Sequence, residues 1–211
     1  MKPVGIIEKP WGHEYLCFRN ENVAIWVLNI NKGHSTSLHC HPNKNTALIV
    51  LSGEIELSFI RDTAPHRLFG LNKLNIFRGR FHQTRALTDN VVLLEVEAPD
   101  NKRDILRLED SYGRQKEPIE EATKPLDDGC LQIHNGYTSA IVVYEFAGCF
   151  LGIVDPPSSV GASDCVFVTL TGGLSHGLVP PGDAIDGDTL HRFMKEFPPL
   201  PNTTFLKIRR L

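Results

Sequence analysis

Two histidines one residue apart, His39 and His41, lie in a stretch bounded by glycines, Gly33 to Gly53. Successive side chains of an extended strand point to opposite faces of the sheet, so both histidines face one way and Cys40 faces the other. Neutral imidazoles bind zinc, iron, nickel, copper and manganese, and two of them on one strand supply half of a chelating set. The stretch therefore predicts a β-strand that carries part of a metal site.

A second glycine-bounded segment, Gly70 to Ala86, supplies a further histidine. His82 follows Gly79 by three residues in this segment. The rest of a chelating set has to come from a strand other than the first, so we expect the two segments to lie close together in the folded chain. The sequence therefore predicts a metal site formed by His39, His41 and His82.

Short runs rich in β-branched and aliphatic residues alternate with turn residues along the chain. This pattern predicts an all-β barrel or sandwich rather than a helical or doubly wound fold. In one run, Glu54 to Ile60, glutamates alternate with apolar residues, which is typical of a strand with one solvated face. The strands expected in the first half are Val23–Ile30, Thr46–Ser52, Glu54–Ile60 and Asn90–Ala98.

The composition excludes several classes of protein. With 211 residues, of which 41% are hydrophobic, the chain can bury a substantial core in one or two domains. No run is long enough to span a membrane, and the opening MKPVGIIEKPWG lacks the apolar core of a signal peptide, so we expect a cytoplasmic protein. The net charge of -3 provides no basic surface for nucleic acid. The five cysteines include no CxxC pair, which predicts free thiols.

The two histidine segments together resemble the two motifs of the cupin superfamily. The positions in register with those motifs are Gly33, His39, His41, Gly53, Gly70, Gly79 and His82. The resemblance implies a double-stranded β-helix, which is a jelly-roll barrel. Cupins have a glutamate ligand a few residues after the second histidine, and this chain has Thr46 there, with Asn45 beside it. The resemblance therefore implies a three-histidine site whose fourth ligand is missing or replaced.

A closer resemblance lies at the two ends of the first half. The opening EKPWGHEY, Glu8 to Tyr15, and the exit RDILRLEDSYGR, Arg103 to Arg114, are similar to the ends of the cupin domain in type II phosphomannose isomerases and bifunctional mannose-1-phosphate guanylyltransferases. Such enzymes interconvert mannose 6-phosphate and fructose 6-phosphate with a divalent metal. The resemblance covers residues 8–115. It implies a sugar phosphate as the substrate and zinc as the metal, with iron, nickel or manganese as alternatives.

The same resemblance sets expectations for the site residues. The family holds its metal with glutamine, histidine, glutamate and histidine, and the matching positions here are His39, His41, Thr46 and His82. Arg114 is predicted to bind phosphate or to stabilise an enediolate, and the alternative is a salt bridge that closes the barrel. No general base is identified. Glu95 and Glu97 lie on the strand after the second motif, where exposed carboxylates are common.

The chain divides into three expected parts, which are a cupin barrel with the metal site at residues 1–115, a charged linker at 116–129 and a β-rich second half at 130–211. Two runs of the second half are similar to runs of the first half: 135–149 to 20–34, and 166–173 to 47–54. The second half is therefore either a degenerate cupin without metal ligands, which would make the chain a bicupin, or an unrelated β-rich extension used for dimerisation. The resemblance to cupins also implies a homodimer.

Three functions stay open on the sequence alone. The leading one is a metal-dependent aldose–ketose isomerase similar to mannose-6-phosphate isomerase. A second is a non-catalytic sugar-binding or scaffold cupin, which the altered ligand set permits. A third is an iron oxygenase, because three histidines with open coordination positions suit ferrous iron and oxygen. The expected partner is a small-molecule substrate, with neither nucleic acid nor a membrane.

Overall fold

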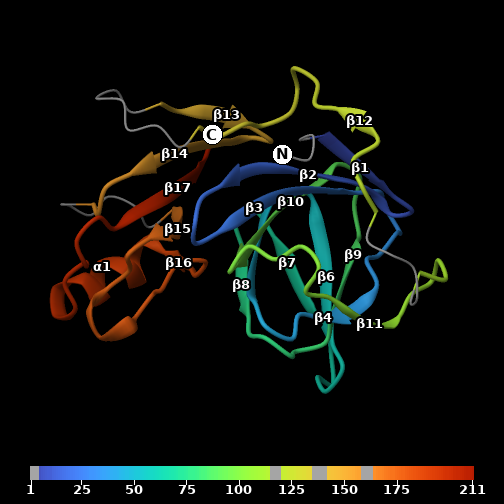
Figure 1. Cartoon of the computed structure of the whole chain (residues 1–211), viewed down its shortest axis with the longest axis horizontal. Helices are drawn as coiled ribbons and strands as arrows, with labels where there is room; N and C mark the ends of the chain where they lie inside the picture. The colour runs from blue at the N-terminus through green and yellow to red at the C-terminus, as the bar shows by residue number, and fades with distance from the viewer. Residues whose placement is uncertain (1–4, 115–119, 135–141, 158–163) are drawn as a thin grey trace.

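The computed structural model describes residues 5–114, 120–134, 142–157 and 164–211. Within these ranges the chain forms three antiparallel sheets and one α-helix. Figure 1 shows two of the sheets forming a barrel, drawn from blue to yellow, and the third sheet lying beside it with the helix.

The barrel is built from a seven-stranded and a five-stranded sheet. The first has the order β12-β1-β2-β3-β10-β5-β8 and the second the order β11-β4-β9-β6-β7. The strands of the first are β1 (Gly5–Lys9), β2 (Gly12–Arg19), β3 (Ala24–Ile30), β5 (Asn45–Ser52), β8 (Lys73–Ile76), β10 (Val91–Ala98) and β12 (Lys124–Pro125). Those of the second are β4 (Leu38–Cys40), β6 (Glu54–Phe59), β7 (His66–Phe69), β9 (His82–Ala86) and β11 (Leu106–Glu109).

The eight strands from β3 to β10 are divided between the two sheets, in the order β3-β10-β5-β8 in the first and β4-β9-β6-β7 in the second. This interleaved order is that of an eight-stranded jelly roll, the architecture that includes the cupins. The prediction of an all-β jelly-roll barrel is therefore confirmed. The four strands expected from the sequence are β3, β5, β6 and β10, each within one residue of its predicted bounds.

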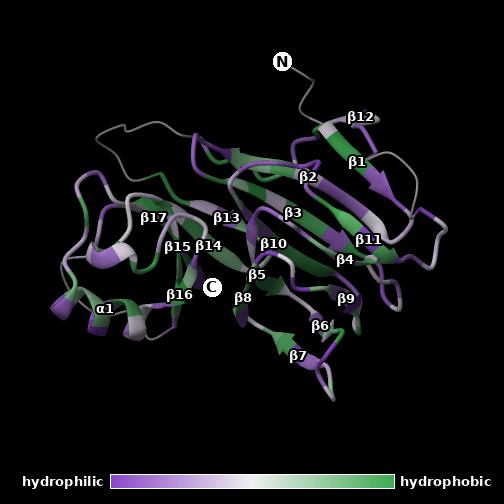
Figure 2. Ribbon diagram, turned by 60° about the horizontal axis from the view of Figure 1, so that its bottom comes forward, coloured by the Kyte–Doolittle hydropathy of each residue, from purple (hydrophilic) through white to green (hydrophobic). Residues whose placement is uncertain are grey.

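The central strands of the seven-stranded sheet are largely apolar on both faces because both faces are covered. In β5, Ala47, Ile49 and Leu51 belong to a core on the outer side of the sheet, whereas Leu48 and Val50 face the barrel interior. A strand buried on both sides has a nearly continuous apolar sequence rather than an alternating one. Figure 2 shows this as green along β5 and β10.

Strand β6 has the single solvated face that its sequence predicts. Ile55, Leu57 and Phe59 are buried in the barrel, whereas Glu54 and Glu56 between them are half-buried. The prediction for this strand is confirmed.

The second half contributes one sheet in the order β13-β14-β17-β15-β16. Its strands are β13 (Tyr144–Phe146), β14 (Cys149–Val154), β15 (Cys165–Thr171), β16 (Ala184–Asp186) and β17 (Thr204–Arg210). The helix α1 (Gly187–Glu196), which the sequence analysis missed, starts where the Asp186 carboxylate accepts the Thr189 N–H at 2.8 Å. None of the helices in the described ranges has the length and apolar character to cross a bilayer.

This arrangement bears on the degenerate second cupin. A jelly roll needs two facing sheets, and the described residues of the second half form a single sheet. The run at 135–141, on which part of the proposed repeat depended, lies outside the described residues. The structure therefore offers no support for a bicupin.

The third sheet packs on the outer face of the seven-stranded sheet, and the two share one hydrophobic core. From the barrel this core includes Ile25 and Ile49, and from the third sheet Leu151, Val168 and Leu206. Residues 131–133 lie along β2, where the Tyr15 hydroxyl accepts the Leu131 N–H at 3.0 Å. The predicted parts 1–115 and 130–211 thus bury one another's apolar surface.

The described part of the predicted linker is also bound to the barrel. Strand β12 pairs with β1, and Glu120 forms ion pairs with Lys9 and Arg114 at 2.7 and 2.8 Å. Residues 116–119 lie outside the described residues. The division into three parts remains a prediction.

The shared core predicts that a cavity made in the third sheet destabilises the barrel. Leu151 is fully buried, so Leu151→Ala is expected to lower the free energy of unfolding by about 2–5 kcal/mol. The two tryptophans, Trp11 and Trp26, both lie in the barrel core, so their fluorescence during urea denaturation reports barrel unfolding. A matched Leu200→Ala variant, at a side chain that is 42% exposed, is expected to change the free energy little. An unchanged tryptophan transition in Leu151→Ala would mean that the two halves unfold independently.

Candidate metal centre

The three predicted histidines come together inside the barrel. His39 on β4 pairs directly with His82 on β9, and His41 follows β4 by one residue. The ring centroids of His39 and His82 are 4.5 Å apart, those of His39 and His41 4.9 Å, and those of His41 and His82 5.6 Å. All three side chains are buried. The strand periodicity that predicted a common face for His39 and His41 thus agrees with their placement.

A carboxylate from the facing sheet completes the cluster. Glu95 on β10 and the three histidines each offer a ligand atom, and these atoms all lie within 4.8 Å of one another. Glu95 Oε1 is 4.0 Å from His41 Nε2. The group could hold a metal ion with three nitrogen ligands and one oxygen ligand, a set that suits zinc and other divalent transition metals.

The fourth candidate ligand therefore comes from a position that the sequence motifs did not indicate. Thr46, at the position of the cupin glutamate, lies opposite Glu97, and the next inward-facing position, Leu48, lies opposite Glu95. The expectation that Glu95 and Glu97 resemble ordinary exposed strand carboxylates is wrong, since they are only 8% and 1% exposed. The signal in the sequence was their spacing, which continues the buried face of Val91 and Leu93.

Hydrogen bonds fix the orientation of all three imidazole rings. Each Nδ1 pairs with a backbone carbonyl: His39 with Ser37 at 2.8 Å, His41 with Asp104 at 2.6 Å and His82 with Arg80 at 3.0 Å. A carbonyl only accepts, so each Nδ1 carries the hydrogen and each Nε2 keeps its lone pair. His41 Nε2 is buried and has no hydrogen-bond partner. These features fit a bound metal, because metal-binding histidines usually donate their other nitrogen in this way.

Burial sets the charge state of the metal-free site. Desolvation lowers the pKa of His41 to about 3 and that of His82 to about 4, and it lowers the pKa of His39 well below its ordinary value. The imidazoles are therefore neutral at pH 7, which is the form that binds metals. Burial, together with the nearby charge of Glu97, raises the pKa of Glu95 to about 7.

The cluster lines a cavity of about 60 Å³ between the two barrel sheets. Five cationic side chains and three carboxylates take part in the lining, which are Lys9, Lys44, Lys102, Arg107, Arg114, Glu14, Glu95 and Glu97. The volume accommodates a few water molecules. The cavity is therefore polar, charged and small.

Two ion-pair groups neutralise part of this charge. Lys44 is 2.7 Å from Glu97 Oε1, and both side chains are almost fully buried. Glu14 Oε1 is 2.7 Å from Lys102 and 3.3 Å from Lys9. Burial opposes ionisation of Glu14, but the charges of Lys102 and Lys9 outweigh it and hold the pKa of Glu14 below its ordinary value.

Arg114 lines the same cavity, but carboxylates engage its guanidinium. Its Nε and Nη2 donate to Asp110 at 2.8 and 2.9 Å, and its Nη1 donates to Glu120 at 2.8 Å. These contacts are those of the salt bridge that the sequence analysis considered as the alternative. The phosphate-binding role of Arg114 remains a prediction.

Comparison with known proteins gives only distant likenesses. No family model and no curated protein matches the sequence. Similar solved structures include KdgF from Halomonas sp., at 13% identity over 44% of this chain and 84% of that chain, with a TM-score of 0.41. The capsular polysaccharide assembling protein CapF from Staphylococcus aureus matches at 18% identity over 51% of this chain and 35% of that chain, with a TM-score of 0.45. An RmlC-like cupin from Shewanella frigidimarina matches at 16% identity over 47% of this chain and 86% of that chain, with a TM-score of 0.42. The assignment of the fold therefore rests on the strand order.

The donor set predicts one divalent ion per chain. Zinc titrated into metal-free protein is expected to stabilise it by about 2.7 kcal/mol at a concentration 100 times the Kd. His82→Ala removes one of four ligands and is expected to weaken zinc binding by at least ~100-fold, more than the loss of an outer hydrogen bond does. His191→Ala, on α1 away from the site, is the control. Equal zinc affinity in the two variants would contradict the site.

The buried ion pair predicts a large cost for removing its cation. Lys44→Met leaves the Glu97 carboxylate buried without its partner and is expected to lower the free energy of unfolding by about 3–5 kcal/mol. The double variant Lys44→Met/Glu97→Gln removes the unpaired charge and is expected to recover part of that loss. Urea denaturation measures both. If the loss of unfolding free energy in the double variant equals the sum of the losses in Lys44→Met and Glu97→Gln, the two side chains do not interact.

Proposed function

We propose that this protein is a metal-dependent enzyme of sugar-phosphate chemistry, an aldose–ketose isomerase similar to mannose-6-phosphate isomerase. The observation that carries the proposal is the buried set of His39, His41, His82 and Glu95 in a cavity lined by charged side chains of both signs. The similarity of residues 8–15 and 103–114 to phosphomannose isomerases supports the choice of substrate.

The donor set suits the chemistry of this reaction. Isomerisation moves a proton between C1 and C2 of an open-chain sugar through an enediol, so it needs a group that polarises the carbonyl and a base. A divalent metal, with zinc as our first choice, would supply the polarisation. We assign the base to Glu97, because it lines the cavity and its Oε2 accepts no hydrogen bond.

The charges of the cavity favour an anionic substrate. Five cationic side chains and three carboxylates line the cavity, and Asp110 and Glu120 pair with Arg114 from outside the lining, so a bound divalent ion would make the net charge of the site positive. A positive cavity with low-dielectric walls attracts anions, so a phosphate ester suits it better than a neutral sugar.

The other functions differ in how well the ligand set supports them. The iron oxygenase depended on three histidines with open coordination positions, and Glu95 offers a fourth ligand. The non-catalytic sugar-binding cupin uses the same cavity and lacks only turnover. A homodimer and a cytoplasmic location remain predictions from the sequence.

A coupled assay for fructose 6-phosphate tests the proposal. Zinc-loaded protein is expected to convert mannose 6-phosphate, and His82→Ala is expected to lose at least ~100-fold in kcat/KM because the carbonyl is no longer polarised. His191→Ala is expected to retain the activity of the parent.

Other outcomes separate the alternatives. If the zinc-loaded parent produces no fructose 6-phosphate but binds the sugar phosphate in calorimetry, the binding-protein alternative replaces the isomerase. Oxygen uptake by iron-loaded protein in the presence of small thiols would favour the oxygenase.

A further inference from the structure

The three site histidines differ in how their rings are held. His39 and His82 pair with the carbonyls of Ser37 and Arg80, each two residues earlier on the same chain segment. These two bonds form whenever the local backbone adopts its extended shape. His41 instead pairs with the Asp104 carbonyl, 63 residues away in the sequence. The orientation of His41 therefore depends on a contact between two distant segments.

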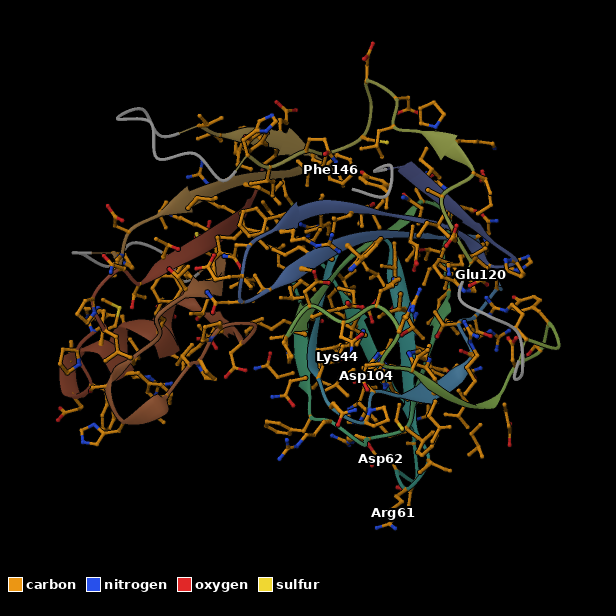
Figure 3. All side chains as sticks on the ribbon, in the orientation of Figure 1. Lys44, Arg61, Asp62, Asp104, Glu120 and Phe146 are labelled. Atoms are coloured by element: carbon orange, nitrogen blue, oxygen red, sulfur yellow. The ribbon has the colours of Figure 1, made fainter. Side chains whose placement is uncertain are left out.

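The side chain of Asp104 makes that contact specific. Its Oδ2 accepts the backbone N–H groups of Asn43 at 2.8 Å and Lys44 at 2.9 Å, and its Oδ1 accepts the Asn43 side-chain amide at 2.8 Å. One residue thus binds the turn after His41 through its carboxylate and the His41 ring through its carbonyl. Figure 3 labels Asp104 beside Lys44 in this part of the barrel.

The charge of Asp104 strengthens these bonds. The side chain is only 6% exposed, and burial works against its ionisation. The N–H groups of Asn43 and Lys44 outweigh that effect and hold the pKa of the carboxyl below its ordinary value. Hydrogen bonds to an ionised acceptor are stronger than those between neutral groups. The ionised carboxylate therefore binds the N–H groups of the turn more strongly than a neutral acceptor would.

A second contact joins the segment that contains Asp104 to the turn after His41. The Lys44 ammonium donates to the Asn101 carbonyl at 3.1 Å while it pairs with Glu97. The segment from Asn101 to Asp104 thus holds both ends of the turn from His41 to Lys44. Neither His39 nor His82 receives a bond from this segment among the described contacts.

We propose that Asp104 is a positioning residue of the metal site, which fixes the tautomer and orientation of His41 by holding its own carbonyl against the ring. The inference rests on the proposed metal site, and it adds a residue outside the ligand set. Without the carboxylate, the 101–104 segment loses its bonds to the turn and the carbonyl is no longer held at 2.6 Å from His41 Nδ1. The hydrogen of His41 can then move from Nδ1 to Nε2, the nitrogen that has to face the metal.

Imidazole ¹⁵N spectra of the metal-free full-length chain at pH 7 test this directly. In the parent protein His39, His41 and His82 are each expected to show the single Nδ1–H tautomer. Asp104→Ala removes the carboxylate and keeps the carbonyl, and it is expected to convert His41 alone to a mixture of both tautomers. Retention of the pure Nδ1–H form at His41 would overturn the proposal, and so would an equal change at all three rings.

Asp110→Ala is the matched control. Asp110 is 8% exposed, and like that of Asp104 its carboxylate accepts several N–H bonds, three from Arg114 and one from the backbone of Tyr112. Its removal costs a comparable set of bonds, yet none of them reaches a histidine. All three rings are expected to keep the Nδ1–H form in this variant. A His41 tautomer mixture in Asp110→Ala would mean that general loosening causes the effect.

Zinc affinity gives the second readout. Asp104→Ala is expected to raise the Kd by about 10–100-fold, as outer-shell substitutions commonly do, and Asp110→Ala by less than about threefold. If Asp104→Ala does not fold, Asn43→Ala removes only the amide bond to Oδ1 from an exposed side chain and is expected to shift His41 partly. No shift at His41 in that variant would count against the proposal.

The two readouts separate this inference from the proposed function. A parent that binds no zinc but shows the Nδ1–H form at His41, lost in Asp104→Ala, would refute the metal site as proposed and leave the positioning contact intact. If the parent and Asp104→Ala bind zinc with equal affinity, the positioning role is refuted and the metal site is not.

Discussion

The site depends on a sheet that is buried on both faces. The central strand β10 directs Leu94 and Val96 outward into the core shared with the third sheet, and Leu93 inward into the barrel. Its next inward positions are Glu95 and Glu97, whose burial costs free energy that apolar residues would not. The covered outer face offsets this cost, because it stabilises the strand through apolar burial without using the inward positions. A barrel with a solvated outer face would have less apolar area to set against two buried carboxylates.

Most of the interior charges are arranged in ion pairs. Lys44 pairs with Glu97, and Lys9 and Lys102 both pair with Glu14. Such pairs contribute little to stability compared with apolar residues of the same size, but they become costly when one member is removed. They hold the polar side chains in fixed positions around the cavity, and the imidazoles among them stay neutral. The neutral imidazole nitrogens keep their lone pairs, and with the Glu95 carboxylate they offer the donors that a metal ion needs at the centre of the cluster.

Local periodicity accounts for what the sequence could predict. The strand period of two placed His39 and His41 on one face, and the glycine frame pointed to His82. Glu95 could not be found in this way, because its approach to the histidines depends on the packing of β10 against a facing sheet. The same limit applies to the third sheet: its strands had recognisable apolar runs, but which face of the barrel they would cover is a matter of tertiary packing. Helix α1 was missed although its signals were local, namely Asp186 as an N-cap and Leu190 buried on one side.

The positions of Thr46 and Glu95 show how a sheet can offer four candidate donors although Thr46 is not one of them. Cross-strand neighbours lie about 4.5–5.5 Å apart, and inward positions two residues apart on one strand lie about 6.5–7 Å apart. Thr46, Leu48, Glu95 and Glu97 form one such block on the inner face of β5 and β10. Glu95 lies on the strand next to that of Thr46 and is displaced by one inward pair, because Thr46 lies opposite Glu97 and Leu48 lies opposite Glu95. From this position its carboxylate still reaches the imidazoles on the facing sheet. A candidate metal site in a barrel is therefore defined by which side chains surround the cavity, and the threonine at residue 46 leaves a buried set of four donors in place.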